Sequence, residues 1–510
     1  MAVTRITTFA FSGIDTLPIE VQVQIASGLP AFTVVGLPDK AVAESRERVR
    51  AALAGMGLAL PPKRVLVNLA PADIQKEGSH FDLPIALAVL AAMGLVPADE
   101  LASFAALGEL ALDGAIGPVA GILPAALGAA SRQLGLICPA QQGGEAAWAG
   151  ELEILAAADL QQLMAHLTGR QLMPPPPLPG LTQEVSRIAC LSEVRGQESG
   201  KRALEIAAAG RHNLLFIGPP GAGKSMLASR LPGLLPDLSP QEALEVSLVH
   251  SVAGLIEGGR ISARPPFRNP HHSASQAALI GGGPRARPGE ISLAHHGVLF
   301  LDELPEFARP ALEALRQPLE SGECVISRAA AHVTYPARVQ LVAAMNPCRC
   351  GYLGEALRAC GSAPRCGETY QSRISGPLLD RVDLSLSVAP ISPGDLARTP
   401  RGETSAAIAA RVAGARDLQA KRRHPDGPRC NADAPLEELT AQCDGEALAL
   451  AERAALQLGL SNRGFTRCFR VARSIADLAG ADRIRRTDMA EALSYRQRHH
   501  PSRMAAAAET

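Results

Sequence analysis

The chain has 510 residues, and its 50 lysines and arginines balance its 50 aspartates and glutamates, so its formal net charge at pH 7 is zero. A chain of this length exceeds a single hydrophobic core, and we expect two to four domains. The neutral balance gives no support for nucleic-acid binding, so any basic surface must be local.

The composition is that of a soluble globular protein, with 47% hydrophobic and 20% charged residues. No run of ~18 apolar residues is present, so we expect no transmembrane helix. The N-terminal residues lack the layout of a signal peptide, which favours a cytoplasmic location. Aromatic residues make up only 3% of the chain, which argues against a platform for stacking bases. Ten cysteines in a cytoplasmic chain are more typical of thiols or metal ligands than of disulfides.

Residues 1–170 are predicted to form one α/β domain. Alternating and short apolar segments indicate strands, and apolar residues at helical spacing indicate helices. The predicted strands are residues 19–25, 32–36 and 64–68, and the predicted helices are residues 40–56 and 83–93. The second helix is almost entirely apolar and is therefore expected to be buried.

Two motifs in this region resemble the protease-like domain of the Lon family (ribosomal S5 domain 2-like), as it occurs at the front of magnesium-chelatase-like ATPases. They are Lys76-Glu-Gly-Ser79-His-Phe-Asp82 and Gly108-Glu-Leu-Ala-Leu-Asp-Gly-Ala-Ile-Gly-Pro-Val-Ala-Gly121. The proteases use a serine and a lysine, but residues 121–130 contain no lysine. An unactivated hydroxyl is a poor nucleophile, so we predict no protease activity and a structural role for Ser79 as a turn or helix cap.

A proline-rich segment separates the first domain from the rest of the chain. Residues 171–189 include Pro174-Pro-Pro-Pro177, which predicts a stiff, extended linker between separable domains. Beyond it we expect a nucleotide-binding core at 190–400, a helical region at 401–500 and a frayed tail at 501–510. The four helices predicted in the helical region are residues 404–423, 444–459, 466–479 and 487–498.

The central motif is a short apolar strand, residues 214–217, followed by a glycine-rich loop and a helix at 226–230. The loop fits the P-loop pattern, in which backbone N–H groups surround phosphate oxygens. The predicted nucleotide-binding residues are Gly218, Pro219, Pro220, Gly221, Ala222, Gly223, Lys224 and Ser225. Lys224 supplies charge at the β- and γ-phosphates, and the Ser225 hydroxyl is a candidate Mg²⁺ ligand. The alternative is an ordinary glycine-rich turn, which the flanking strand and helix make improbable.

Two further apolar strands end in polar residues that complete a hydrolysis site. After strand 298–301, Asp302 can hold Mg²⁺ through water, and Glu303 can orient and deprotonate the attacking water. After strand 339–344, Asn346 can hold that water against the γ-phosphate; the alternative is a turn former before Pro347.

Two arginines are candidates for transition-state stabilisation. Arg381 would not reach the nucleotide of its own chain and would act as an arginine finger for a neighbouring subunit. Arg463 is placed to reach back from the helical region. An isolated arginine is more often a solvated charge, and only the order of the motifs favours a catalytic role for these two.

The order of these motifs resembles that of the AAA+ ATPases. Two predicted insertions, residues 254–297 and a hairpin at 323–335, are similar to those of the helix-2-insert branch, which contains magnesium chelatase and the MCM helicases. Longer motifs resemble the ComM (YifB) family: Arg268-Asn-Pro-His-His272, Pro288-Gly-Glu-Ile-Ser-Leu-Ala-His295, Phe300-Leu-Asp-Glu-Leu-Pro-Glu-Phe307, Met345-Asn-Pro-Cys348 and Arg373-Ile-Ser-Gly-Pro-Leu-Leu-Asp-Arg381.

The resemblance implies an α/β fold with a Lon-like front domain, a parallel-sheet AAA+ core and a helical lid. It also implies a homohexamer that uses ATP and Mg²⁺ to drive branch migration of DNA junctions during natural transformation. Two alternatives stay open: a chelatase-like ATPase subunit that remodels a protein or metal-insertion partner, and a nucleotide-gated scaffold with negligible turnover. Glu303 and Arg381 argue against the scaffold.

Four cysteines with the spacing C-x-C-x9-C-x5-C lie close together in the sequence, Cys348, Cys350, Cys360 and Cys366. Four thiolates can enclose a tetrahedral Zn²⁺, and reduced free thiols are the equal alternative. For the pairs His271-His272 and His295-His296 a positional or packing role is favoured over a second metal site. The candidate DNA contacts are Arg285, Arg287, Arg328 and the basic run Arg483-Ile-Arg-Arg486, each of which is more often a solvated charge.

Overall fold

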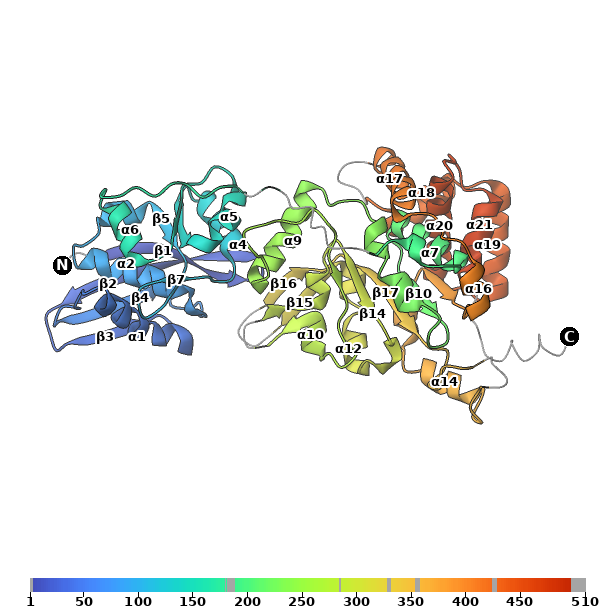
Figure 1. Ribbon diagram of the computed structural model, residues 1–510, viewed down its shortest axis with the longest axis horizontal. Helices are drawn as coiled ribbons and strands as arrows, with labels where there is room; N and C mark the ends of the chain where they lie inside the picture. The colour runs from blue at the N-terminus through green and yellow to red at the C-terminus, as the bar shows by residue number, and fades with distance from the viewer. Residues whose placement is uncertain are drawn as a thin grey trace.

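The computed structural model of the protein describes residues 3–178, 180, 189–283, 286–327, 332–353, 358–423 and 429–496. The chain forms an elongated molecule in which the N-terminal part, the central part and the C-terminal helices lie in a row (Figure 1). Two large sheets organise the first two of these parts, one of seven strands and one of five.

The first sheet has the strand order β3-β4-β2-β1-β5-β8-β9. Strand β2 pairs antiparallel with both β1 and β4, whereas the remaining neighbours pair in parallel. In β2, Ile19, Val21 and Val23 are buried and their neighbours are more exposed, as period-two alternation requires. The strands are β1 (Thr4–Ser12), β2 (Asp15–Ala26), β3 (Ala31–Val35), β4 (Arg64–Ala70), β5 (Phe104–Ala106), β8 (Gly135–Pro139) and β9 (Ile154–Ala157).

Helices cover this sheet, and both predicted helices are confirmed. Helix α1 (Lys40–Gly55) starts at Asp39, whose carboxylate accepts a hydrogen bond from the backbone N–H of Val42. Helix α2 (Asp82–Ala92) packs on β1 and β2 and is buried along almost its whole length, as its composition predicts. The other helices of this part are α3 (Ala98–Ala102), α4 (Ile122–Ala130), α5 (Gly143–Ala146) and α6 (Leu160–Leu167).

The second sheet is entirely parallel, with the order β11-β14-β17-β10-β18. Its strands are β10 (Leu214–Ile217), β11 (Phe267–Arg268), β14 (Val298–Leu301), β17 (Gln340–Met345) and β18 (Leu384–Ser387). The three predicted strands β10, β14 and β17 are its centre. Because all five strands point the same way, the loops that follow them meet at one edge, which is where ligands bind in sheets of this kind.

Two insertions interrupt this sheet. The hairpin of β15 (Glu323–Ser327) and β16 (His332–Pro336) confirms the prediction for 323–335. The first insertion is narrower than predicted, because β11 lies within 254–297 and pairs with β14. Only two residues form β11, too few to show a strand period. The inserted part proper follows β11 and contains α10 (Gln276–Ile280), β12 (Gly281–Gly282), β13 (Arg287–Pro288) and α11 (Glu290–Leu293).

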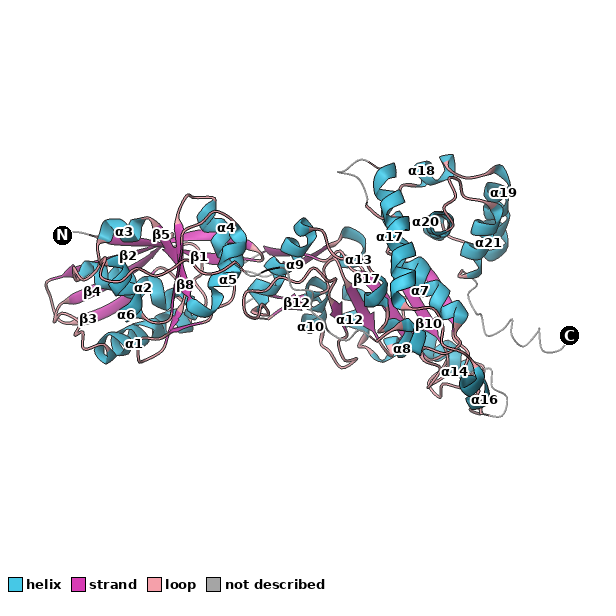
Figure 2. Ribbon diagram, turned by 45° about the horizontal axis from the view of Figure 1, so that its top comes forward, coloured by secondary structure: helices cyan, strands magenta, loops and turns pink. Residues whose placement is uncertain are grey.

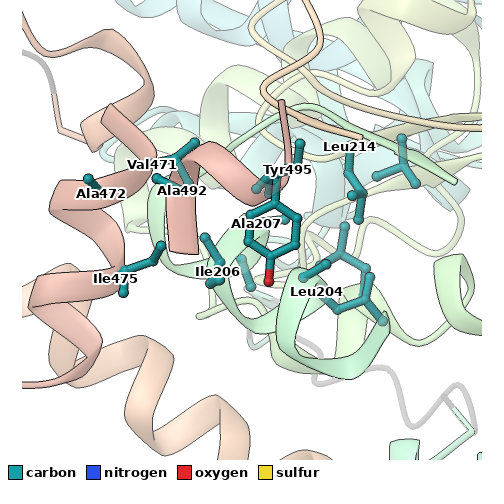
Figure 3. Packing of buried hydrophobic residues seen from close by; sticks show 14 of the residues in the cluster. Leu204, Ile206, Ala207, Leu214, Val471, Ala472, Ile475, Ala492 and Tyr495 are labelled. Carbon is teal, nitrogen blue, oxygen red and sulfur yellow. The ribbon is translucent and has the colours of Figure 1, made fainter. Parts of the chain in front are cut away.

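The C-terminal part consists of helices (Figure 2). Their buried residues form one core with those of the second sheet. Figure 3 shows Val471 and Ile475 of helix α20 close to Ile206 of helix α7. The backbone N–H of Ser385 in β18 donates to the carbonyl of Tyr495 at 3.0 Å. Helix α7 (Glu198–Gly210) precedes β10 and belongs to the central part. The C-terminal helices are α17 (Ser405–Arg422), α18 (Leu436–Ala441), α19 (Gly445–Leu458), α20 (Asn462–Leu478) and α21 (Arg486–Ser494).

Helix α20 begins four residues earlier than predicted. Ser461 caps it by accepting a hydrogen bond from the backbone N–H of Gly464, which places Arg463 in the first turn. The predicted tail, 501–510, lies outside the described residues, as does most of the second half of the predicted linker.

The N-terminal part packs on helix α9 (Pro240–Ala253) of the central part. The backbone N–H of Gly121 donates to the carbonyl of Ser251 at 2.9 Å, and the Trp148 indole donates to the carbonyl of Gly259 at 2.9 Å. The buried Glu145 carboxylate accepts hydrogen bonds from the Ser251 hydroxyl at 2.5 Å and from the Leu123 backbone N–H at 3.1 Å.

Candidate nucleotide-binding site

The loop after β10 has the backbone conformation of a phosphate cradle. Gly221 and Gly223 have φ angles of +78° and +89°, which glycine adopts without strain, and a Cβ at either would meet nothing within 4 Å. At Gly218 a Cβ would lie 2.2 Å from the Val388 carbonyl oxygen, so a side chain there is excluded. The loop therefore has space at Gly221 and Gly223, where a phosphate would sit, and at Gly218 it packs tightly against Val388, which follows β18. Its residues fit a bound nucleotide.

Lys224 ends the glycine-rich loop as the first residue of helix α8 (Lys224–Ala228), and its side chain is buried. Its ammonium donates to the carbonyls of Gly218 at 2.7 Å and Pro219 at 2.9 Å, and to Asn346 Oδ1 at 3.0 Å. Burial lowers the pKa of Lys224, and the charges of Asp302 and Glu303 oppose that shift. The structure therefore brings Lys224 and Asn346 together, in a place where an anion would relieve the desolvation of the ammonium.

Ser225 and Asp302 meet across the gap between the P-loop and β14. The Ser225 hydroxyl donates to Asp302 Oδ2 at 2.5 Å. Hydroxyl and carboxylate oxygens are the donors that Mg²⁺ prefers, so this pair fits the ion. Glu303 follows with φ +53°, and its backbone N–H donates to Asp302 Oδ1 at 2.9 Å.

His272 is a site residue that the sequence did not identify. Its Nδ1 lies 3.1 Å from Glu303 Oε2, so the imidazole contacts the carboxylate expected to activate water. The sequence prediction for the pair His271-His272 was a positional or packing role. The spacing of 31 residues between His272 and Glu303 carries no signal, because the two meet only when β11 and β14 pair.

Arg381 and Arg463 share one partner, Glu320, which lies outside the P-loop. Both guanidinium groups contact the carboxylate of Glu320 in α13 (Pro318–Ser321), and the Arg463 Nη2 distance is 2.7 Å. Arg381 also donates to the Pro377 carbonyl at 2.7 Å. A cleft of about 530 Å³ opens beside them, lined by Glu313, Arg316, Gln317, Glu320, Ser321 and Arg381.

Ser79 opens the short turn Ser79–Phe81 and donates to Glu109 Oε2 at 2.5 Å. The Lys76 ammonium is buried and donates to the Pro71 carbonyl, and burial lowers its pKa. These partners supply a structural reason for both residues. Ser79 forms no side-chain capping bond at the start of that turn, so its place is a turn and not a cap.

Three of the four cysteines predicted to lie together have converging thiols, and the fourth, Cys360, lies beside them. The thiols of Cys348, Cys350 and Cys366 all lie within 4.8 Å of one another, with Cys348 Sγ 3.1 Å from Cys350 Sγ. The Cys360 thiol contacts those of Cys350 and Cys366. The histidine pair His295-His296 lies with Glu245, and the ligand atoms of the three are within 4.8 Å of one another, with His296 Nε2 2.7 Å from Glu245 Oε2.

The candidate DNA contacts divide into two groups. Arg285 and Arg328 lie outside the described residues, whereas Arg287 is exposed on β13. In the basic run 483–486, Arg483 pairs with Asp444 at 2.8 Å and Arg485 pairs with Asp488 at 2.9 Å. These carboxylates neutralise part of the predicted patch.

Comparison with known proteins identifies the family. Three family models match consecutive parts of the chain: "Subunit ChlI of Mg-chelatase" over 21–142, "Magnesium chelatase, subunit ChlI" over 190–396 and "Magnesium chelatase, subunit ChlI C-terminal" over 402–496. The "Uncharacterized protein YifB" of Escherichia coli is 46% identical over 501 residues, 97% of each chain. The "Competence protein ComM" of Haemophilus influenzae is 45% identical over 502 residues, 96% of each chain. The chain belongs to the ComM/YifB family of magnesium-chelatase-like proteins.

A more distant relative extends the family toward chelatase itself. The "Magnesium-chelatase 38 kDa subunit" of Rhodobacter capsulatus is 26% identical over 338 residues, which cover 61% of this chain and 88% of that one. The fold is the predicted α/β class, with a parallel sheet and a helical C-terminal part, and the family implies ATP and Mg²⁺ as ligands. Among the helices of the described residues, none has the length and apolar character needed to cross a membrane.

Proposed function

We propose that this ComM/YifB-family protein is an ATP-hydrolysing motor that assembles as a homohexameric ring and acts on branched DNA. The observation that carries the ATPase part is the meeting of Lys224, Asn346 and the Ser225–Asp302 pair at one edge of a parallel sheet. Each comes from a different loop, and together they supply a cation, a polar amide and oxygen donors around an open glycine loop. This is the set of groups that phosphoryl transfer requires.

In the proposed site, the backbone of the P-loop and Lys224 hold the phosphates of ATP, and Ser225 with Asp302 hold Mg²⁺. The ion neutralises phosphate charge when it is bound. Glu303 accepts a proton from the attacking water, and Asn346 orients that water. His272 contacts Glu303 Oε2 at 3.1 Å, so it holds the carboxylate of Glu303 until substrate is bound.

We further propose that Arg381 and Arg463 act on the nucleotide of a neighbouring subunit. Their contacts with Glu320 lie beside the open cleft of about 530 Å³, and a neighbour's phosphates are the ligand that two guanidinium groups would recognise there. A site shared in this way requires assembly, which supports a ring.

The DNA part of the proposal is supported by a relative of nearly equal length. The Haemophilus protein, 45% identical over 96% of each chain, is named for competence, the state in which cells take up DNA. We infer that this chain promotes branch migration while incoming DNA is integrated by homologous recombination. The second candidate is an ATPase subunit that remodels a protein or metal-insertion partner, which the 26% identity with the magnesium-chelatase subunit favours.

Steady-state ATP hydrolysis with and without a four-way DNA junction tests the proposal. The Glu303→Gln variant is the blank, because glutamine keeps the shape of the side chain and cannot accept a proton. Strong stimulation by the junction, absent from the blank, supports a DNA motor. Robust hydrolysis that no DNA changes would move the assignment to a protein or metal-insertion partner, and no hydrolysis under any condition would refute the ATPase role.

A further inference from the structure

The loop between β17 and α14 (Arg365–Gln371) brings three cysteine thiols together, and a fourth cysteine, Cys360, lies beside them. Cys348, Cys350 and Cys366 lie mutually within 4.8 Å, and Cys360 contacts Cys350 and Cys366. Cys348 is fully buried, and the other three are partly buried. All ten cysteines of the chain are free thiols, and the other six carry no such grouping among the described residues.

Three converging sulfurs with a fourth cysteine beside them suit a tetrahedral thiophilic cation better than any other occupant. Free thiols are weak hydrogen-bonding groups and gain little from one another. Carboxylate and imidazole donors are absent from the described group, which excludes the oxygen-loving cations. We propose that Cys348, Cys350, Cys360 and Cys366 bind one Zn²⁺ that fixes this loop against the phosphate-binding loop.

The position of the cluster means that a bound metal would restrain the segment that carries Asn346. Cys348 follows Asn346 by two residues, so an ion on its sulfur anchors the segment that presents Asn346 to Lys224. Gln371 of α14 donates to the Pro347 carbonyl at 2.9 Å and holds the other end of the loop close to this segment. The metal therefore joins the start and the end of one loop.

The same loop packs directly on the P-loop. At Gly351 a Cβ would lie 2.4 Å from Pro220 Cδ, so the backbone beside the cluster is in close contact with the proline of the phosphate cradle. When Zn²⁺ is bound, the loop is held in contact with Pro220. Without the metal, the backbone at Gly351 is less restrained, and the positions of Pro220 and Asn346 are less well fixed.

The first experiment measures metal in the full-length wild-type chain, purified under reducing conditions from cells supplied with zinc. Mass spectrometry of the metal content should give about one Zn²⁺ per chain, as in closed four-thiolate sites. Replacement by Co²⁺ should give the absorption bands of a tetrahedral tetrathiolate. A folded, reduced chain with no stoichiometric metal, or Co²⁺ bands of an octahedral oxygen site, would overturn the proposal.

The second experiment measures binding of a fluorescent ATP analogue to the wild type, Cys366→Ser and the control Cys190→Ser, whose thiol lies outside the cluster. Cys366→Ser should lose the metal and bind the analogue about tenfold more weakly, the scale of one hydrogen bond to a charged group. Cys190→Ser should match the wild type. If Cys366→Ser loses the metal but keeps its nucleotide affinity, the metal does not support the P-loop and that part of the proposal is wrong.

Chelation covers the case in which Cys366→Ser fails to fold. The wild-type chain, stripped by a chelator and then refilled with Zn²⁺, should lose and regain nucleotide affinity by the same factor. A nucleotide affinity that stays constant through both chelation and refilling overturns the link between the metal and the nucleotide site. The link to the P-loop rests on the proposed nucleotide site, whereas the metal content is measured without nucleotide, DNA or turnover, so a failure of the zinc site is distinct from a failure of the proposed motor function.

Discussion

Replacing Glu320 by glutamine should raise ATP turnover, because Glu320 occupies the two arginines that we assign to a neighbour's nucleotide. Its carboxylate accepts hydrogen bonds from Arg381 and, at 2.7 Å, from Arg463. A guanidinium bound to a carboxylate of its own chain is unavailable to a phosphate. Glutamine preserves the shape of the side chain and removes the charge that holds both arginines.

The exposure of these groups sets the size of the effect. The side chains of Glu320 and Arg463 are 54% and 60% exposed, so solvent screens their attraction. Exposed ion pairs contribute roughly 0.2–1 kcal/mol each, and two pairs give about 0.4–2 kcal/mol. That range corresponds to a rise of about 2- to 30-fold in the population with free arginines. The Arg381 side chain is only 7% exposed, which favours the upper part of the range.

The assay is steady-state ATPase activity at protein concentrations that support assembly. Glu313→Gln is the matched control: Glu313 lines the same cleft and pairs with Arg316 at 2.8 Å instead of Arg381. We expect higher turnover for Glu320→Gln and little change for Glu313→Gln. If Glu320→Gln instead reduces turnover as far as Arg381→Ala does, Glu320 positions the arginine rather than restraining it, and the reasoning is refuted.

Three further predictions follow from single contacts. Arg381→Ala should leave nucleotide binding largely intact and reduce turnover by roughly 10³-fold or more, and turnover close to wild type would count against a shared site. His272→Ala frees Glu303 Oε2 and should raise basal hydrolysis a few-fold, with DNA stimulation correspondingly smaller; an unchanged ratio would exclude a restraining role. Burial raises the pKa of Glu145, so its contribution to stability is full below the usual pKa of 4.5 and is lost as pH rises through the folded pKa. Glu145→Gln should remove this pH dependence in urea unfolding, about 1.4 kcal/mol per unit of pKa difference, and an unaltered pH profile would argue against it.

The centre of the second sheet was predictable because its strands are short, uniformly apolar and followed by polar residues of fixed type. Those local signals located β10, β14 and β17 and the residues at their ends. Strand β1 was missed because its buried residues do not form an apolar alternation: the polar Thr8 is buried, and Phe9 and Ala10 are buried side by side. Strand β11 has two residues and carries no period.

The parts of the site that the sequence did not predict are contacts between segments far apart in the chain. His272 reaches Glu303 only through pairing of β11 with β14, and Glu320 meets Arg463 across 143 residues. No local spacing encodes such contacts. The cysteines are an intermediate case, since their grouping in sequence suggested a cluster and the fold alone established that the thiols converge.

Glu145 connects the N-terminal part to helix α9 of the central part. One side of α9 presents Ser251 to Glu145, and the same helix presents Glu245 to His296, 2.7 Å from its Nε2. The His296 backbone N–H donates to the Arg338 carbonyl at 2.9 Å. His296 lies two residues before β14, and Arg338 lies two residues before β17. A chain of contacts therefore connects the N-terminal part, through α9 and His296, to the starts of the two strands that precede Asp302 and Asn346. This path joins a domain without a recognised catalytic pair to the residues that we propose to act in hydrolysis.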